Sequence, residues 1–284
     1  MGYFYTQIAR FLENVVVETG QHLAMSVAGI LFLGFPVSFS LGAYTFAILE
    51  ENGISMALAV TGALLSSSVL GVLFALLYRR LSNDSFAVFS LASVLAFDAV
   101  LRSWDSLTGG VLGISGVPRP AFLSSFLALV LLQTVIATLF LLFEYIVLHS
   151  SLGRSLQAHK ESKTFLDSLG VHSKNVGSLA IIFASFSGAV GGIITIWRIQ
   201  FLDPTFGGIP MLLIMLSMSI LAMKPRVFWM FSTVLFITLL PEVLRLFPFP
   251  SSIIGHLRLL LYSVFLILLV NKLSSGYTSE KRFV

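Results

Sequence analysis

Asp98, Glu144 and Glu242 are acidic residues that stand inside long apolar stretches of the sequence. A carboxyl group at membrane depth is costly to keep charged, so a protein that retains one most often uses it for proton or ion transfer. All three residues lie near an end of their stretch, within reach of an interface or of an arginine such as Arg102 or Arg245. The sequence therefore leaves two interpretations open, a proton relay and a structural ion pair, and it favours the second.

Catalytic and metal chemistry find little support in the sequence. The chain has no cysteine, which excludes disulfides, thiolate catalysis and cysteine-type metal sites. Nothing resembles a phosphate-binding glycine loop or a nucleophile elbow. The five histidines show no metal-ligand spacing: they are His22, His149, His159, His172 and His256. We therefore predict no catalytic residue, no metal site and no cofactor, and we expect a transport subunit and not an enzyme.

The elements that position these residues are predicted to be membrane helices. Hydrophobic residues make up 57% of the chain and charged residues only 11%, which does not fit a soluble domain. A helix needs about 20 mostly apolar residues to cross a bilayer. The sequence has about eight such stretches, at 22–49, 54–78, 86–101, 121–148, 179–197, 209–223, 227–246 and 254–270. We expect an all-α polytopic membrane helix bundle whose energy comes from a gradient or from another subunit.

The order of segments predicts one membrane domain with short additions. Residues 1–20 are expected to form an amphipathic or disordered lead-in, residues 21–272 a single transmembrane domain, and residues 273–284 a tail. Cytoplasmic loops hold the excess of positive charge. With both termini in the cytoplasm, most of the 17 lysines and arginines fall on that side: Arg10, Arg79, Arg80, Arg154, Lys160, Lys163, Lys174, Lys224, Arg226, Lys272, Lys281 and Arg282. We expect a multi-pass protein of the cell membrane with a cytoplasmic loop at 150–176, and no nucleic-acid partner.

The first apolar stretch is interrupted by Gly34, Phe35 and Pro36. Irregular backbone at membrane depth is tolerated only where protein or a water-filled cavity satisfies it. The break therefore indicates either a discontinuous helix that lines a translocation path or a simple kink. The outer loop 102–120 is rich in glycine and fits a gate, a docking surface or a re-entrant connection. Candidate path or gate residues are Pro36, Ser38, Ser40, Gly42, Tyr44, Thr108, Gly109 and Gly110.

Ala184, Gly188 and Gly192 repeat at four-residue spacing. Such a face allows close helix contact in lipid. It predicts packing within the subunit or across a dimer, with a role in lining the path as the weaker alternative.

The polar segment 152–171 stands between long apolar stretches. A short helix over 161–169 would place Phe165, Leu166 and Leu169 on one face, with Gly170 as its stop. This face fits the groove of a soluble partner. The alternative is an amphipathic connector that lies on the lipid headgroups.

Three motifs resemble the permease subunits of branched-chain amino-acid ABC importers. Residues 153–171 follow the family pattern Gly-Arg-Ala-Leu-x-Ala-Ile-Arg-Glu-x-x-x-Ala-Ala-Glu-x-Leu-Gly-Ile. Residues 107–118 are similar to Leu-Thr-Gly-Gly-x-x-Gly-Ile-Ser-Gly-Ile-Pro, and residues 41–45 contain the family's Gly-Ala-Tyr. The resemblance runs from about residue 30 to about residue 270, and its three motifs occur in the family's order.

The resemblance implies an ATP-driven importer that forms a path for branched-chain or other hydrophobic amino acids by alternating access. It implies ABC ATPase subunits, a second related or identical permease subunit, an extracytoplasmic substrate-binding protein and the lipid bilayer as partners. It also implies ATPase-coupling residues, which are Gly153, Arg154, Leu156, Ala158, Lys160, Glu161, Phe165, Leu166, Leu169 and Gly170. Urea, short amides and other small polar solutes remain alternative substrates. A gradient-driven transporter or channel without an ATPase remains the alternative class.

The sequence also departs from the family pattern. Residues 35–40 replace the usual Gly-Gln-x-Ser-Leu-Gly-His, and residues 222–226 replace a turn rich in glycine. His159 stands where isoleucine is usual, and Phe165 and Leu166 stand where alanines are usual. These changes leave the substrate and the ATPase partner open, and the bulkier segment fits a dedicated ATPase.

Overall fold

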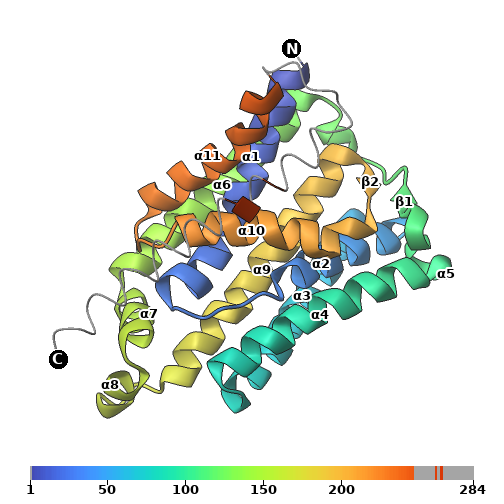
Figure 1. Cartoon of the computed structure of the whole chain (residues 1–284). Coiled ribbons are helices and arrows are strands. Elements are labelled where there is room, and N and C mark those ends of the chain that lie inside the picture. The colour runs from blue at the N-terminus through green and yellow to red at the C-terminus, as the bar shows by residue number, and fades with distance from the viewer. Residues whose placement is uncertain (1, 246–259, 261–262, 265–284) are drawn as a thin grey trace.

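The fold is a bundle of helices packed side by side, with two very short strands at one end (Figure 1). It is known from a computed structural model that describes residues 2–245, 260, 263 and 264. In chain order its elements are α1 (Gly2–Gln21), the π-helix η1 (His22–Val27), α2 (Phe35–Glu51), α3 (Met56–Arg80), α4 (Asn83–Ser103), α5 (Asp105–Thr108), η2 (Gly110–Leu112), β1 (Ile114–Ser115), η3 (Ala121–Leu123), α6 (Phe126–His149), α7 (Ser151–Glu161), α8 (Lys163–Ser168), α9 (Ser173–Ile199), β2 (Phe201–Leu202), η4 (Pro204–Gly207), α10 (Ile209–Leu221) and α11 (Val227–Arg245).

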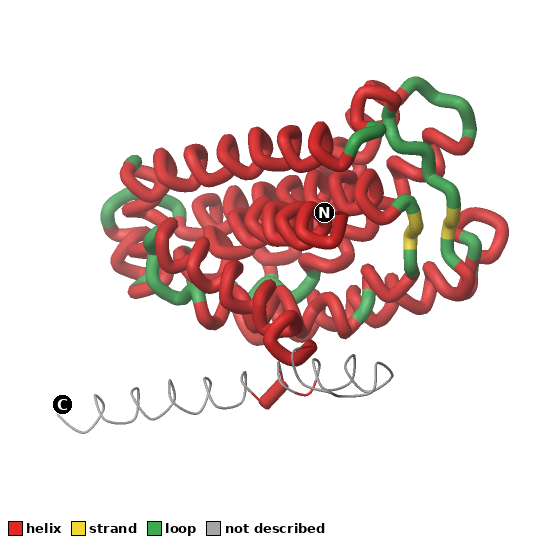
Figure 2. Tube along the Cα trace, turned by 90° about the horizontal axis from the view of Figure 1, so that it is seen from above, coloured by secondary structure: helices red, strands yellow, loops and turns green. Residues whose placement is uncertain are grey.

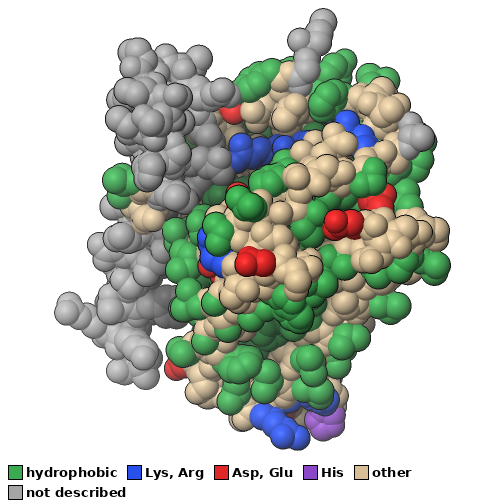
Figure 3. All heavy atoms as spheres, turned by 90° about the vertical axis from the view of Figure 1, so that its right-hand side faces the viewer, with side chains coloured by type: hydrophobic (Ala, Val, Ile, Leu, Met, Phe, Trp, Pro, Cys, Tyr) green, Lys and Arg blue, Asp and Glu red, His purple; other side chains and the backbone are tan. Residues whose placement is uncertain are grey.

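Four of the described helices are long and apolar enough to cross a membrane: α3, α4, α6 and α9. Hydrophobic side chains cover much of the face seen in Figure 3, with basic side chains in its upper part and again at its lower end, where a histidine lies beside them. The predicted all-α polytopic bundle is confirmed. The number of spans is not established, because the stretch 254–270 lies almost wholly outside the described residues, as does the predicted tail.

Helix α9 is the centre of the bundle. In its most apolar window 72% of the residues are buried, against 17% for α6. Its small residues explain this position. A Cβ on Gly192 would lie 2.3 Å from the Phe39 carbonyl oxygen of α2, and one on Gly42 would lie 2.6 Å from Ala189 Cα. The predicted small-residue face therefore packs within the subunit, where it lets α2 approach α9 closely.

Helix α1 lies inside the bundle, which differs from the lead-in predicted for residues 1–20. Seen from above, it begins near the middle of the molecule (Figure 2). Its residues Glu13 and Glu18 are buried, and it packs against α6 and α9. Residues 2–21 form one helix, and its Glu13 and Glu18 side chains meet buried partners inside the bundle.

The direction of α1 follows from two contacts with α6. Glu13 of α1 accepts a hydrogen bond from Gln133 of α6. Farther along both segments, His22 of η1 contacts Glu144 of α6. The two helices therefore run in the same direction. Since α6 leads into α7, α1 begins at the end of the bundle opposite α7 and α8 (Figure 1). The prediction that the amino terminus shares a side with the 150–176 loop does not agree with this arrangement.

The predicted first stretch, 22–49, is a discontinuous helix. The π-helix η1 ends at Val27, residues 28–34 are not helical, and α2 begins at Phe35. Pro36 occupies the first turn of α2, where its missing N–H and fixed φ favour helix initiation. Pro36 thus starts a helix and does not kink one. Pro210 begins α10 in the same way after the short η4 turn.

Candidate functional site

The polar segment folds as two helices and not as the single helix predicted over 161–169. α7 ends at Glu161, and α8 begins at Lys163. Ser162 separates them with an extended backbone, and its hydroxyl accepts the backbone N–H of Phe165 as the cap of α8. Gly170 then has a φ of +78°, a conformation that glycine adopts without strain, so the chain turns there as predicted.

The hydrophobic residues of α7 and α8 point in two directions. Leu156 and Leu166 are buried against the protein's own core, whereas Phe165 and Leu169 are exposed by 59% and 62%. The predicted common face of Phe165, Leu166 and Leu169 is therefore divided. Of the other predicted coupling residues, Gly153 is buried, Ala158 is half-buried, and the remaining ones are exposed: Arg154, Lys160, Glu161 and Gly170.

Helix α7 is hydrogen-bonded to the interrupted stretch 22–49 through two side chains. His159 Nδ1 lies 2.7 Å from the Ala28 carbonyl oxygen, and Lys160 Nζ donates to the Ser26 carbonyl oxygen at 2.9 Å. Lys160 also packs over Gly29, where a Cβ would lie 2.8 Å from its Cγ. The carbonyl groups that the helix break leaves without intrahelical partners are thus satisfied by α7.

His159 also connects α7 to α3. Its Nε2 lies 2.8 Å from the Tyr78 hydroxyl, and Lys163 Nζ donates to the same hydroxyl at 2.9 Å. Burial lowers the pKa of the His159 imidazole. Burial also lowers the pKa values of Lys160 and Lys163. A neutral His159 donates from Nδ1 to Ala28 and accepts from Tyr78, so one imidazole links three elements.

A second contact fixes the junction of α8 and α9. The backbone N–H and the hydroxyl of Ser173 both donate to the Asp167 carboxylate, at 2.7 and 3.0 Å. These hydrogen bonds lower the pKa of Asp167. Because α9 is the central helix, the position of α8 is tied to the core of the bundle.

The candidate path residues lie in two groups. Ser38, Ser40 and Tyr44 are buried in α2, and their hydroxyl oxygens have no hydrogen-bond partner among the described residues. Pro36 starts the same helix, and Gly42 packs against α9. The first group therefore carries unused polar capacity in the protein interior.

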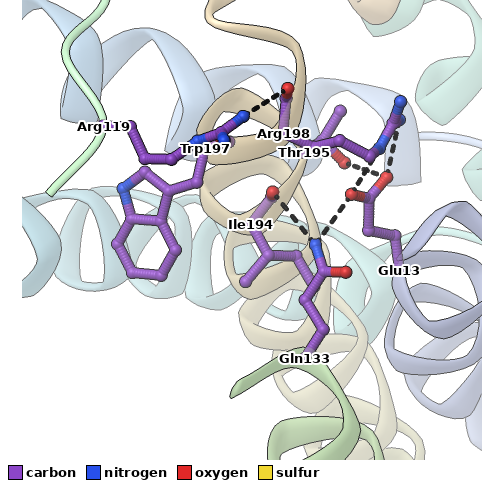
Figure 4. Close-up of polar contacts among 7 residues, drawn as sticks. All are labelled: Glu13, Arg119, Gln133, Ile194, Thr195, Trp197 and Arg198. Atoms are coloured by element: carbon purple, nitrogen blue, oxygen red, sulfur yellow. Dashed lines mark hydrogen bonds and ion pairs between the residues drawn. The ribbon is translucent and has the colours of Figure 1, made fainter. Parts of the chain in front are cut away.

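The second group caps the carboxyl end of α4. Thr108 donates to the Leu101 carbonyl at 2.6 Å, while Gly109 and Gly110 adopt positive φ. The loop is then fixed by the β1–β2 pair, with Ile114 opposite Leu202. Arg119 donates to the carbonyls of Trp197 and Arg198 at the end of α9 (Figure 4). Helix α2 contacts α5, which contains Thr108, so the two groups lie on neighbouring elements.

The three acidic residues singled out from the sequence all have partners. Arg102 donates to Asp98 at 2.9 Å, and Tyr3 donates to Glu242. Glu144 pairs with His22 at 2.5 Å, a partner the sequence did not suggest. The structural interpretation of Asp98 is confirmed.

A buried ion pair was missed by the sequence reasoning. Glu13 of α1 accepts two hydrogen bonds from Arg198 of α9, at 2.7 and 2.8 Å (Figure 4). Gln133 and Thr195 donate to the same carboxylate. The 185 positions that separate Glu13 from Arg198 in the chain hid the pairing.

Long apolar helices, a discontinuous span and buried ion pairs define a polytopic helical membrane protein. The family model described as "Branched-chain amino acid transport system / permease component" matches residues 17–279, so the chain belongs to this family. The chain is 26% identical over 210 residues to the high-affinity branched-chain amino acid transport system permease protein LivM of Escherichia coli (strain K12). It is 26% identical over 208 residues to the protein of the same name from Salmonella typhimurium.

The two alignments cover 62% of this chain and 48% of each relative. The chain therefore spans about half the length of these curated relatives. No solved structure matches it.

Proposed function

We propose that this chain is the membrane-spanning subunit of an ATP-driven importer, in which it forms the translocation path for branched-chain or other hydrophobic amino acids. Membership of the permease family supports this proposal. The observation that carries it is the attachment of α7 to the broken first stretch through His159 and Lys160. A segment that a soluble subunit can reach is thereby joined to a span whose backbone is interrupted.

The exposed surface of α7 and α8 is the contact for an ATPase subunit. Phe165 and Leu169 present apolar side chains to solvent beside Arg154 and Glu161. Aromatic and aliphatic anchors in a groove supply most of the affinity of such an interface, and the charged rim sets partner choice. Gly153 holds α7 tightly against the end of α6, because a Cβ there would lie 2.2 Å from the Val147 carbonyl oxygen. A displacement of α8 is therefore transmitted through α7 to the end of α6.

Movement of α7 acts on the path through the break. When two ATPase subunits close, His159 and Lys160 pull on the carbonyls of Ala28 and Ser26, and the start of α2 moves with them. Ser38 and Ser40 follow the break in sequence, and their buried hydroxyls, which have no hydrogen-bond partner among the described residues, would meet a solute or water when the path opens. The two conformations open a path between two permease subunits to opposite sides of the membrane.

The other partners and the location follow from the same proposal. The protein lies in the cell membrane with α7 and α8 on the cytoplasmic side. The strand pair β1–β2 and loop 102–120 face an extracytoplasmic substrate-binding protein. ATP hydrolysis belongs to a separate subunit.

Co-purification of the tagged protein from its native membrane tests this function. Phe165→Glu with Leu169→Glu places two charges on the exposed surface and disturbs no buried contact. We expect an ATPase subunit to accompany the wild-type protein and to be lost from the double variant. Leu112→Glu is the matched control, because Leu112 is also exposed but belongs to the opposite end of the bundle. A wild-type protein that purifies without an ATPase, under conditions that keep known complexes intact, would overturn the proposal.

A further inference from the structure

A cavity of about 370 Å³ lies between α1, α9, η4 and the start of α10. Its volume falls within the range of about 300–1,000 Å³ that is typical of small-molecule sites. Its lining residues include none from loop 102–120 and neither Ser38 nor Ser40. Nothing in the sequence pattern or the comparisons assigns it a ligand.

One end of the cavity carries both signs of charge. Arg10, Glu13 and Arg198 line it together with the polar side chains of Asn14 and Thr195. Arg198 directs two of its five N–H groups to Glu13, which leaves three that Glu13 does not use. Asn14 donates its amide to Thr238, so its carbonyl oxygen remains an acceptor. This end therefore offers the remaining Arg198 N–H groups to a carboxylate and the Asn14 carbonyl oxygen to an ammonium group.

The other end of the cavity is apolar. Val17 stands one helical turn beyond Glu13, in the direction of η1. Phe39 and Phe206 meet edge to face, with ring centroids 6.2 Å apart, and Met211 and Ile214 of α10 complete the lining. Since α1 runs from the outer end of the bundle toward α7, the charged end of the cavity is the outer one and the apolar end lies deeper.

We infer that this cavity is the site at which the permease holds an L-amino acid with an aliphatic side chain. Its carboxylate lies at Arg198, its ammonium group at the Asn14 carbonyl oxygen beside Glu13, and its side chain between Phe39, Phe206 and Met211. The inference rests on the proposed function and names a site for its substrate. Urea or a short amide would leave the apolar end empty and the charged wall unused. A fatty acid would match only half of the charged wall.

The site is also connected to the coupling segment. Phe39 lies in the second turn of α2, which begins directly after the break that α7 holds. Phe206 belongs to η4, directly before α10, the other helix that begins with a proline turn. Each aromatic residue thus lies beside an interrupted segment, so a shift of α2 changes the distance between the two rings. Alternating access would act on the apolar end of this cavity first.

Cysteine protection tests the inference, because the chain has no native cysteine to interfere. Met211→Cys and Ile214→Cys each place one thiol at the apolar end, and Leu112→Cys places one on the exposed outer loop as the control. The modification rate by a methanethiosulfonate reagent is measured on the complete importer with rising L-leucine. The competing probes are leucinamide, which lacks the carboxylate, 4-methylpentanoate, which lacks the ammonium group, and urea.

We expect saturating leucine to slow modification at both cavity positions more than fivefold, the other three probes to have little effect, and Leu112→Cys to react at one rate throughout. Unchanged rates at both cavity positions, in an importer that still takes up leucine with ATP, would overturn this site and leave the proposed function standing. Protection by urea in place of leucine would overturn the site as an amino-acid site. Loss of ATP-driven uptake in the wild-type importer would instead count against the proposed function.

Discussion

The two ends of α1 hold buried acidic residues in different ways. At the outer end, Glu13 accepts four hydrogen bonds, two of them from a permanently charged arginine. At the inner end, Glu18 has the Ser219 hydroxyl and Glu144 has His22, and neither partner carries a permanent charge. The outer end is therefore a fixed wall beside the cavity. The inner end continues into a π-helix and an irregular segment whose carbonyls are held by α7.

The difference indicates that the two ends of α1 have different roles. A bidentate arginine pair costs much to break once it is buried, so it favours a single geometry. Single hydrogen bonds from histidine and lysine side chains to backbone carbonyls are individually weaker and exchange more readily. We expect substrate to be held at the rigid end and motion to begin at the other.

The largest expected effect is at the rigid end. Arg198→Leu leaves the Glu13 carboxylate buried without its cation, which should destabilise the protein by about 3–5 kcal/mol. Thermal unfolding in detergent measures this loss. The double variant Glu13→Leu with Arg198→Leu should recover much of it, because no unpaired charge remains. A single variant as stable as the double would show that Glu13 is not held by Arg198.

A smaller loss is expected where α2 meets α9. Gly192→Leu forces a side chain against the Phe39 carbonyl oxygen, and overpacking of this kind costs about 1–3 kcal/mol. Leu65→Ala serves as the control, because Leu65 lies on the exposed face of α3. Thermal unfolding should distinguish the two variants. Equal stability would mean that α2 moves away from α9 at little cost.

The smallest expected effect is the pH dependence of the α7 attachment. Burial lowers the pKa of His159 below the ordinary value of about 6.5, the neighbouring Lys163 lowers it further, and the Ala28 hydrogen bond and Asp167 oppose this. The neutral form is therefore favoured in the folded protein. Its stabilisation is complete above the unfolded pKa and is lost as the pH falls through the lower folded pKa.

Hydrogen exchange of the α7 amides checks this expectation. Protection should decrease as the pH falls below about 6.5, after correction for the intrinsic exchange rate. The decrease should be absent in His159→Gln, which cannot gain a proton. The same pH profile in both proteins would assign the effect to another group.

Much of the fold could be predicted because apolar length and composition report directly on membrane helices. The break at Pro36 could also be predicted, since proline and glycine act locally on the backbone. The position of α1 could not. With Glu13 and Glu18, the α1 segment has the composition of a surface helix. These two residues are buried because they have partners on α6, α9 and α10, more than 100 positions away.

The candidate site was predicted in part for a similar reason. Residues 153–170 were recognised from a local motif, and a stop at Gly170 follows from glycine alone. The division of α7 from α8 had a local signal as well, because Ser162 is a favoured helix cap. The contacts of His159 with Ala28 and Tyr78 depend on tertiary packing, and no spacing within the sequence reports them.

The central claim is that α7 transmits the work of an ATPase to the broken span, and ATP-driven leucine uptake into proteoliposomes by His159→Ala tests it most directly. His149→Ala is the matched control, because His149 is exposed and bonds only within its own helix end. We expect the ATPase to remain bound to His159→Ala while uptake falls at least tenfold, with uptake by His149→Ala unchanged. Normal uptake by His159→Ala with the ATPase bound would contradict the account.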